Sequence, residues 1–364
     1  MIRFIALALI MISSPAWSQS LDEHAQSLVE SGSPGAVAML GVGEDTTISV
    51  AGVRAIDSNV QIEIDDLWHI GSNTKAMTAM LVARLVEQDV ISWEDTIGQH
   101  LGEAIPDIRA VYADVTFVEL LSHRSGLPPN AGLMTLLRLS GADANRDDVA
   151  DRLNYARSVL TKNPGGERGA FLYSNSGYIV AGAMLEAATG EGWRALMTRE
   201  VFEPLGLESA GFGPPGVGGE MDQPRGHRPG LLGGMNAIEP GSGQADNPPA
   251  LGPAGRVHIS MRDYATFLRA VIAGANGDDG DYLGTESWER LLTPVGDSYA
   301  LGWGVMPNGA LAHAGSNTMW FLQAVIWPDE RRFVVLGVNN ANMSRVPQAM
   351  APIIEALGPE GGRD

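Results

Sequence analysis

Apolar runs predict β-strands near both ends of the chain. Two runs, Gly35–Val42 and Thr46–Val53, flank a Gly-Glu-Asp turn and follow a short helix expected over Leu21–Glu30. The second group lies near the C-terminus, where turns separate four predicted strands: Tyr299–Met306, Ala310–His313, Trp320–Trp327 and Arg332–Val338. These four segments predict an antiparallel meander. A last helix is expected over Val346–Leu357.

The hydrophobic period changes to that of helices in the middle of the chain. Apolar side chains between Met77 and Leu85 recur at three- and four-residue spacing, which predicts an amphipathic helix that begins at the Gly71-Ser72 step. Further helices are expected over five segments: Thr116–Leu121, Asp147–Leu160, Tyr178–Ala188, Trp193–Phe202 and Met261–Ala273. No strong strand pattern interrupts them.

Strands at both ends with helices between them predict an α/β (α+β) fold. One antiparallel sheet is built from N- and C-terminal segments, flanked by helices, with an inserted helical subdomain. We expect a single domain over residues 19–364, with an α/β part (19–70 plus 290–364) and a mainly helical part (71–289). Residues 211–255 are rich in glycine and proline. They predict long ordered loops, which are often functional, or alternatively a mobile surface insertion.

The N-terminus has the pattern of a secretory signal peptide. A positive start at Arg3 precedes an apolar run over Phe4–Ile12 and the small-residue pattern of Ala16–Ser18. This apolar run is too short to cross roughly 30 Å of hydrocarbon. We therefore expect a signal peptide over residues 1–18, a periplasmic or secreted protein, and no membrane anchor after signal removal.

Composition excludes several functional classes. The formal net charge of −19 argues against nucleic-acid binding, which needs clustered lysine and arginine. The absence of cysteine excludes disulfides, thiol catalysis and cysteine-based metal sites. The seven histidines show no metal-ligand spacing, so we expect no metal and no cofactor. The expected partner is a small-molecule or peptide substrate, and the sequence carries no indication of oligomeric state.

The first candidate chemical motif is Ser72-Asn73-Thr74-Lys75. Residues three apart share one helix face, so the Lys75 amine can approach the Ser72 hydroxyl. Burial lowers the pKa of a lysine, and a neutral amine can accept the proton of a nucleophilic serine. The alternative is that Ser72 only caps the helix and Lys75 is solvated. The chain has only one other lysine, Lys162, which favours a role for the Lys75 amine.

The second candidate motif is Tyr173-Ser174-Asn175, just before a predicted helix. A phenol can relay a proton if a neighbouring cation lowers its pKa from about 10, and an asparagine can orient Lys75 or hold a substrate amide. The alternative is a half-buried aromatic side chain at Tyr173, with Asn175 or Ser176 as a helix cap.

The third candidate motif is His313-Ala314-Gly315-Ser316, at the end of a predicted strand. Gly315 lets a substrate backbone lie against the strand edge, and the Ser316 N–H can serve as an oxyanion donor. The alternative is an ordinary turn with a surface histidine at position 313.

The three motifs, in this order and rough spacing, resemble the serine β-lactamase and penicillin-binding protein superfamily. The resemblance is greatest to the branch of class C β-lactamases, D-alanyl-D-alanine carboxypeptidases, D-aminopeptidases and family VIII carboxylesterases, and it spans about residues 20 to 345. Four intervening runs agree with it: Leu120–Leu127, Phe202–Leu207, Pro253–Gly255 and Tyr299–Val305.

The resemblance implies an exported serine hydrolase. Ser72 is then the acylated nucleophile, Lys75 and Tyr173 shuttle its proton, and the N–H groups of Ser72 and Ser316 hold the oxyanion. In this reading Asn175, His313 and Gly315 line the substrate site. The scissile carbonyl belongs to an amide, a lactam or an ester.

His313 stands where efficient β-lactamases have a lysine. A neutral histidine attracts a substrate carboxylate less strongly, so we expect a carboxylesterase or D-peptide hydrolase with little β-lactamase activity. A non-turnover penicillin- or peptidoglycan-binding protein is the remaining alternative. The sequence argues against an α/β-hydrolase, because no serine lies in a Gly-x-Ser-x-Gly elbow.

Overall fold

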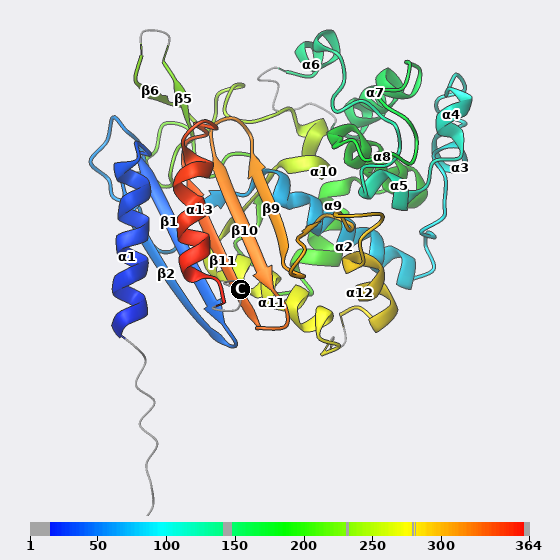
Figure 1. Ribbon diagram of the computed structural model, residues 1–364. Helices are drawn as coiled ribbons and strands as arrows, with labels where there is room; N and C mark the ends of the chain where they lie inside the picture. Colours follow the sequence, from blue (N-terminus) through cyan, green and yellow to red (C-terminus); the bar gives the residue numbers. More distant parts are fainter. Residues whose placement is uncertain (1–14, 141–147, 231–232, 279, 281, 360–364) are drawn as a thin grey trace, which may run out of the picture.

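The computed structural model describes residues 15–140, 148–230, 233–278, 280 and 282–359. Its main element is a six-stranded antiparallel sheet with the strand order β2-β1-β11-β10-β9-β8 (Figure 1). The strands are β1 (Gly35–Val42), β2 (Asp45–Gly52), β8 (Gly304–Val305), β9 (Leu311–Ser316), β10 (Phe321–Trp327) and β11 (Arg332–Val338). The N- and C-terminal strands therefore form one sheet, as expected.

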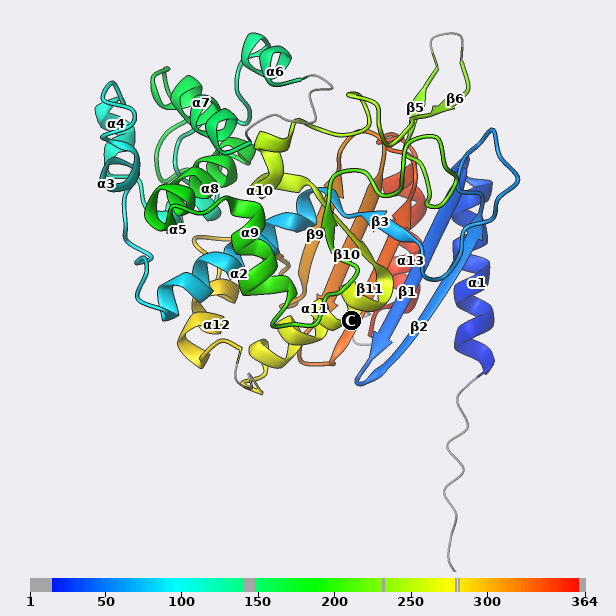
Figure 2. The same cartoon turned by 180° about the vertical axis from the view of Figure 1, so that it is seen from behind.

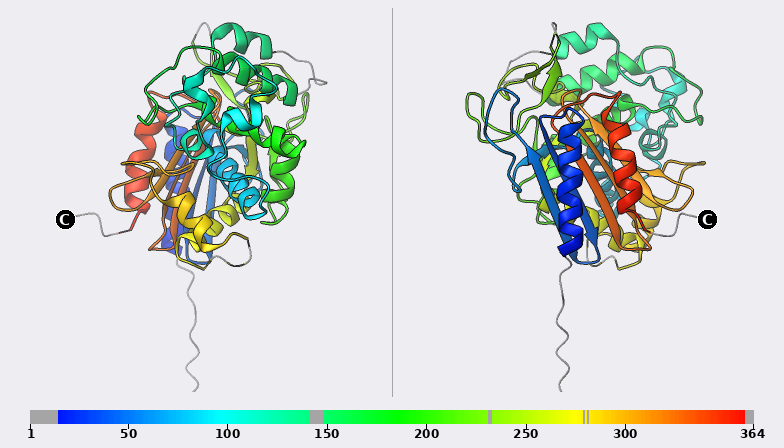
Figure 3. Two further views of the ribbon diagram at one scale, coloured as in Figure 1. Left: turned by 90° about the vertical axis from the view of Figure 1, so that its right-hand side faces the viewer. Right: turned by 60° about the vertical axis from the view of Figure 1, so that its left-hand side comes forward.

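Strand β11 shows why the central strands of the sheet have apolar residues at successive positions. Val334 and Leu336 pack in the core beneath α1 (Pro15–Glu30) and α13 (Val346–Leu357), whereas Phe333 and Val335 belong to the larger core on the opposite face. Alternate residues of a strand point to opposite faces, so a sheet that is covered on both sides needs apolar residues at every position. Figure 3 shows the two helices side by side on one face.

The opposite face of the sheet packs against the helical part of the chain. Helix α2 (Thr74–Glu87) lies on the face of the sheet opposite α1 and α13, as seen from behind in Figure 2. Eleven of its residues are buried, Lys75 among them. The other helices are α3 (Ile97–Leu101), α4 (Ala110–Ala113), α5 (Phe117–Leu121), α6 (Leu133–Leu139), α7 (Asp148–Leu160), α8 (Asn175–Thr189), α9 (Trp193–Met197), α10 (Gly252–Gly255), α11 (Met261–Ala275) and α12 (Thr285–Leu292).

Most predicted helices are present with shifted ends. Helix α8 begins three residues before the predicted start at Tyr178, because Ser174 caps it by accepting a hydrogen bond from the Gly177 N–H. The predicted helix over 193–202 is α9 followed by a π-helical turn (Thr198–Phe202). The predicted start of α7 at Asp147 lies outside the described residues.

Two expectations about strands are wrong. The predicted strand Tyr299–Met306 is reduced to the two residues of β8, because Gly302 bends the chain with a φ of 93°. The middle of the chain, expected to lack strands, contributes to a three-stranded sheet in the order β3-β7-β4: β3 (Leu67–His69), β7 (Val257–Ser260) and β4 (Gly211–Phe212). Such short strands leave no readable period in the sequence.

The segment 211–255 is not one long loop. Its described residues contain β4, the hairpin of β5 (His227–Pro229) and β6 (Met235–Ala237), a 3₁₀ turn (Pro249–Leu251) and α10. Side chains such as His227 and Ala245 are buried. The segment is thus tied to the core at several points.

The signal peptide prediction falls mostly outside the described residues, since these begin at residue 15. Residues 15–18 form the first turn of α1. No helix within the described ranges has the length and apolarity needed to span a membrane.

Candidate active site

The Ser72-Lys75 motif lies at the junction between the small sheet and α2. Strand β3 ends at His69, a 3₁₀ turn follows over Gly71–Asn73, and α2 continues from Thr74. The Lys75 Nζ donates to the Ser72 Oγ at 3.0 Å. Neither helical start uses Ser72 as a capping side chain, so the simple capping alternative for this serine is excluded.

Lys75 is fully buried, and its Nζ lies within hydrogen-bonding distance of three oxygens. Besides Ser72, its Nζ contacts the Asn175 Oδ1 at 2.8 Å and the Ala254 backbone oxygen at 2.5 Å. No acidic side chain is among these partners. Burial lowers the pKa of Lys75 well below its ordinary value, because desolvation penalises the charged amine. A neutral amine offers a lone pair to the Ser72 proton.

Two glycines allow the backbone around Ser72 to pack against β9. A Cβ on Gly71, whose φ is 53°, would lie 2.4 Å from the Ser316 nitrogen. A Cβ on Gly315 would lie 2.7 Å from the Ser72 nitrogen and 2.0 Å from the Ile70 oxygen. The backbone nitrogens of Ser72 and Ser316 therefore lie next to two positions where only glycine fits.

Tyr173 completes the cluster around Ser72. Its ring centroid lies 5.1 Å from the Lys75 Nζ, and its side chain is about one-third exposed, at 36%. Burial of the phenol raises the pKa of Tyr173 to about 12, although the Ser72 hydroxyl acts in the opposite direction. This direction is opposite to the one that a neighbouring cation would produce, because desolvation of the phenol is the larger effect. Tyr173 is therefore a neutral phenol that can donate or pass on a proton.

Asn175 is oriented from two sides. Its Oδ1 accepts from Lys75, and its Nδ2 donates to the Asn130 Oδ1 at 2.9 Å. Ser174, not Asn175 or Ser176, caps α8, and its hydroxyl also donates to the Pro128 oxygen. Because Ser174 caps the helix, the Asn175 side-chain oxygen can accept from Lys75.

His313 is buried, and both its ring nitrogens have partners. Nδ1 lies 3.0 Å from the Ala314 oxygen, so it carries the proton, and the Tyr299 hydroxyl then donates to Nε2 at 3.1 Å. Burial, assisted by Lys75, lowers the pKa of His313 to about 3. The surface-histidine alternative is wrong. His313 is a neutral side chain on β9, and this strand continues through Gly315 and Ser316.

Sequence reasoning missed His123, which the structure brings to Tyr173. The two ring centroids are 4.3 Å apart, and the His123 Nδ1 accepts from the Ser174 N–H at 3.0 Å. Burial lowers the pKa of His123 to about 2. The only available signal was the run Leu120–Leu127, which contains this histidine. Asn130 and the Ala254 carbonyl were also missed, since neither residue type marks a site by itself.

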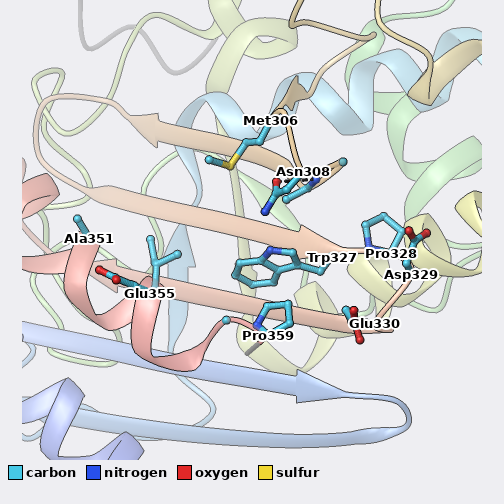
Figure 4. A pocket seen from close by; sticks show the side chains of 13 residues that line it. Met306, Asn308, Trp327, Pro328, Asp329, Glu330, Ala351, Glu355 and Pro359 are labelled. Carbon is cyan, nitrogen blue, oxygen red and sulfur yellow. Dashed lines mark hydrogen bonds between the residues drawn. The ribbon is translucent and has the colours of Figure 1, made fainter. Parts of the chain in front are cut away.

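The cavity shown in Figure 4 is separate from this cluster. It has a volume of 440 Å³ and is lined by the loop between β8 and β9, by the end of β10 with the turn that follows it, and by the C-terminal part of α13. Met306, Trp327 and Ile354 are among its apolar residues. None of the candidate catalytic side chains lines it. Over the ranges that the structure describes, no group of three or more histidine or acidic side chains is placed to hold a metal ion.

A family model described as Beta-lactamase matches residues 21–356 of the chain. Among curated relatives, the unguisins hydrolase ungD of Aspergillus violaceofuscus is 29% identical over 177 residues, which are 45% of this chain and 29% of that protein. Penicillin-binding protein 4 of Amycolatopsis lactamdurans is 29% identical over 311 residues, covering 80% of this chain and 77% of the relative. The first of these alignments thus spans well under half of the fungal enzyme.

Solved structures share the fold. The octameric penicillin-binding protein homologue from Pyrococcus abyssi superposes with a TM-score of 0.74 at 22% identity, and the match covers 93% of this chain and 77% of that one. At this identity the similarity concerns the architecture alone.

Proposed function

This chain belongs to the Beta-lactamase family, and we propose that it is a serine hydrolase that cleaves ester and amide carbonyls through an acyl-enzyme on Ser72. One observation carries the proposal. The amine of a fully buried lysine with a lowered pKa lies 3.0 Å from the hydroxyl oxygen of a partly exposed serine, Ser72. A buried amine without an acidic partner loses its proton readily, and strongly shifted groups of this kind cluster at functional sites.

Acylation begins with neutral Lys75. Its Nζ takes the Ser72 hydroxyl proton while the Ser72 Oγ forms a bond to the substrate carbonyl carbon. When the tetrahedral intermediate collapses, the bond to the leaving group breaks, and the leaving oxygen or nitrogen receives a proton through the Tyr173 phenol, which Lys75 restores. In deacylation water attacks the ester carbon, gives its proton to the same pair, and releases Ser72.

The oxyanion is assigned to the backbone. The nitrogens of Ser72 and Ser316 lie close to the Gly315 and Gly71 backbone, and pre-organised backbone donors stabilise the charge that develops in the transition state. Loss of one such donor typically lowers the rate by about 10²- to 10³-fold.

The preferred substrates in this proposal are small esters and D-amino-peptide amides. A β-lactam carries a carboxylate that is best bound by a cation. His313 is neutral and buried, and its ring nitrogens are occupied by Ala314 and Tyr299, so this position supplies no such cation. We therefore expect weak β-lactam turnover.

Intact-mass analysis tests the nucleophile. Wild-type protein and Ser72→Ala are incubated separately with an aryl ester, penicillin and a fluorophosphonate. We expect a covalent adduct on the wild type only, together with turnover of the aryl ester. An adduct that persists in Ser72→Ala contradicts the assignment, whereas acylation without any turnover indicates a penicillin- or peptide-binding protein in place of an enzyme.

Export and domain extent belong to the same proposal. We propose that residues 1–18 are a signal peptide, that residues 19–364 form one catalytic domain, and that the mature protein is periplasmic or secreted. Cleavage after Ser18 would shorten α1 at its N-terminal end. N-terminal sequencing of protein expressed in a Gram-negative host is expected to start at Gln19, and an intact Met1 in the extracellular or periplasmic fraction would contradict it.

A further inference from the structure

A buried carboxylate, Asp246, gathers polar groups from three separate segments. Its Oδ2 accepts from the His69 Nε2 and the Arg256 Nε, each at 3.0 Å. Its Oδ1 accepts from the Asn317 Nδ2 at 2.9 Å and from the Asn247 backbone N–H at 2.7 Å. Its side chain is only 2% exposed. All its lone pairs therefore point at donors inside the protein.

The hydrogen bonds determine how His69 and Asn317 are oriented. The His69 Nδ1 accepts from the Gly71 N–H at 3.2 Å, so the ring proton lies on Nε2 and is donated to Asp246. The Asn317 Oδ1 accepts from the backbone N–H groups of Met319 and Trp320, which turns its Nδ2 toward Asp246. Neither side chain can turn over without losing these bonds.

The three segments are those that build the backbone around Ser72. His69 holds the Gly71 N–H, one residue before Ser72. Asn317 directly follows Ser316, and Arg256 follows the Ala254-Gly255 pair.

These segments also touch one another at the candidate oxyanion site. A Cβ on Gly255 would lie 3.4 Å from the Ser72 nitrogen, and one on Gly71 would lie 2.4 Å from the Ser316 nitrogen. The Ala254 carbonyl accepts from Lys75. One carboxylate thus accepts hydrogen bonds from each of the segments that carry the candidate oxyanion donors.

We propose that Asp246 is a positioning residue that holds the Ser72 and Ser316 N–H groups in the geometry of an oxyanion site. The inference rests on the function proposed above and extends it to a second residue of the segment 211–255, whose Ala254 carbonyl already accepts from Lys75. Burial acts to raise the pKa of the Asp246 carboxyl, but His69 and Arg256 outweigh it and keep the carboxyl ionised. The Asp246 side chain is therefore a buried, charged acceptor.

The test variant is Asp246→Asn. It keeps an oxygen for Asn317 and the Asn247 N–H, but it places an amide NH₂ where His69 and Arg256 donate. We expect kcat for para-nitrophenyl acetate to fall about 10- to 100-fold, a loss no larger than that caused by removal of an oxyanion donor. We expect KM to change less than about threefold.

The matched control is Glu200→Gln. Glu200 is also a buried carboxylate, bonded to Arg199 and Gln88, but it lies by the far end of α2, roughly 20 Å along the helix from Lys75. We expect it to lower thermal stability as Asp246→Asn does while leaving kcat within about twofold of wild type.

A second readout separates positioning from general stability. Phenylboronic acid forms a bond between boron and the Ser72 Oγ, whose proton passes to Lys75, and the tetrahedral boronate then occupies the oxyanion site. Its affinity should fall in Asp246→Asn by about the same factor as kcat. If this variant does not fold by circular dichroism, Asn317→Ser takes its place, with an expected loss of about three- to tenfold in both measurements.

Three results in the folded variant overturn the inference while the proposed function stands: an unchanged kcat, a rise in KM with no change in kcat, or an undiminished boronate affinity. Wild-type protein that neither hydrolyses the ester nor binds the boronate overturns both. A parallel loss in kcat and boronate affinity that is absent from Glu200→Gln supports the positioning role.

Discussion

The Lys75 amine lies 2.8 Å from the Asn175 side-chain oxygen, although 100 residues separate them in the chain. This contact joins the N-terminal turn of α2 to that of α8. A buried lysine usually forms an ion pair with a carboxylate, but here the partner is the neutral Asn175 amide. The amine is therefore stabilised by neutral dipoles only. The result is a basic group that stays hydrogen-bonded without a permanent positive charge.

Replacing Lys75 with arginine should abolish most of the activity. A guanidinium keeps a cation but cannot accept a proton from Ser72 near neutral pH. We expect kcat/KM for an aryl ester to fall about 10²- to 10⁴-fold, the usual contribution of a general base. The exposed Lys162 is the matched control, and Lys162→Arg should retain wild-type rates. Comparable rates for the two variants would remove Lys75 from proton transfer.

Asn175→Asp should shift the pH dependence of the reaction. A carboxylate in place of the amide, next to the Lys75 Nζ, raises the pKa of that amine by direct attraction. In the wild type kcat/KM rises with pH as Lys75 loses its proton. In the variant this rise moves to higher pH, and the rate near pH 7 falls more than about tenfold, with partial recovery at alkaline pH. A pH–rate profile that coincides with that of wild type would contradict this.

Gly315→Ala should impair both folding and catalysis. The new Cβ would meet the Ile70 oxygen at 2.0 Å and the Ser72 nitrogen at 2.7 Å, so the strand must move away from the nucleophile. We expect the free energy of unfolding to fall by about 1–3 kcal/mol and kcat/KM by at least about 10²-fold. Gly241→Ala, whose Cβ makes only ordinary contact, is the control for alanine substitution. Urea denaturation and ester hydrolysis measure the two effects.

Acid should destabilise the fold through its buried histidines. The pKa of His313 is lowered to about 3 and that of His123 to about 2, so both stay neutral in the folded state while the unfolded chain gains a proton below about pH 6.5. Above about pH 6.5 these two histidines therefore do not change the free energy of unfolding. Below about pH 6.5 each lowers it by up to about 1.4 kcal/mol per pH unit, until the pH reaches the pKa of that histidine in the folded state.

The variant His313→Gln isolates one of these contributions. It retains hydrogen-bonding groups for Tyr299 and Ala314 but has no proton to gain. We expect its free energy of unfolding to decline less steeply than that of wild type between pH 6 and pH 4. Parallel declines for the two proteins would show that His313 does not cause the acid sensitivity.

The fold was predictable where burial imposes a period on the sequence. Strands β1 and β11 and helices α5 and α11 begin and end within two residues of the predicted bounds, because their buried positions are apolar. The short strands β3, β4 and β7 escaped prediction because two to four residues carry no period. The helices α3, α4, α6 and α12 were likewise not identified.

The sequence by itself determined the sheet of N- and C-terminal strands, the helical insertion, the family, and the pairing of Ser72 with Lys75 three residues along a helix. These features depend on local periodicity and on motif spacing. Only the tertiary structure decided the protonation states of Lys75, Tyr173 and His313, because burial and partners from distant segments set a pKa. It also brought Asp246 beneath the Ser72 turn, since a hydrogen-bonded cluster of residues far apart in the chain leaves no pattern along the chain.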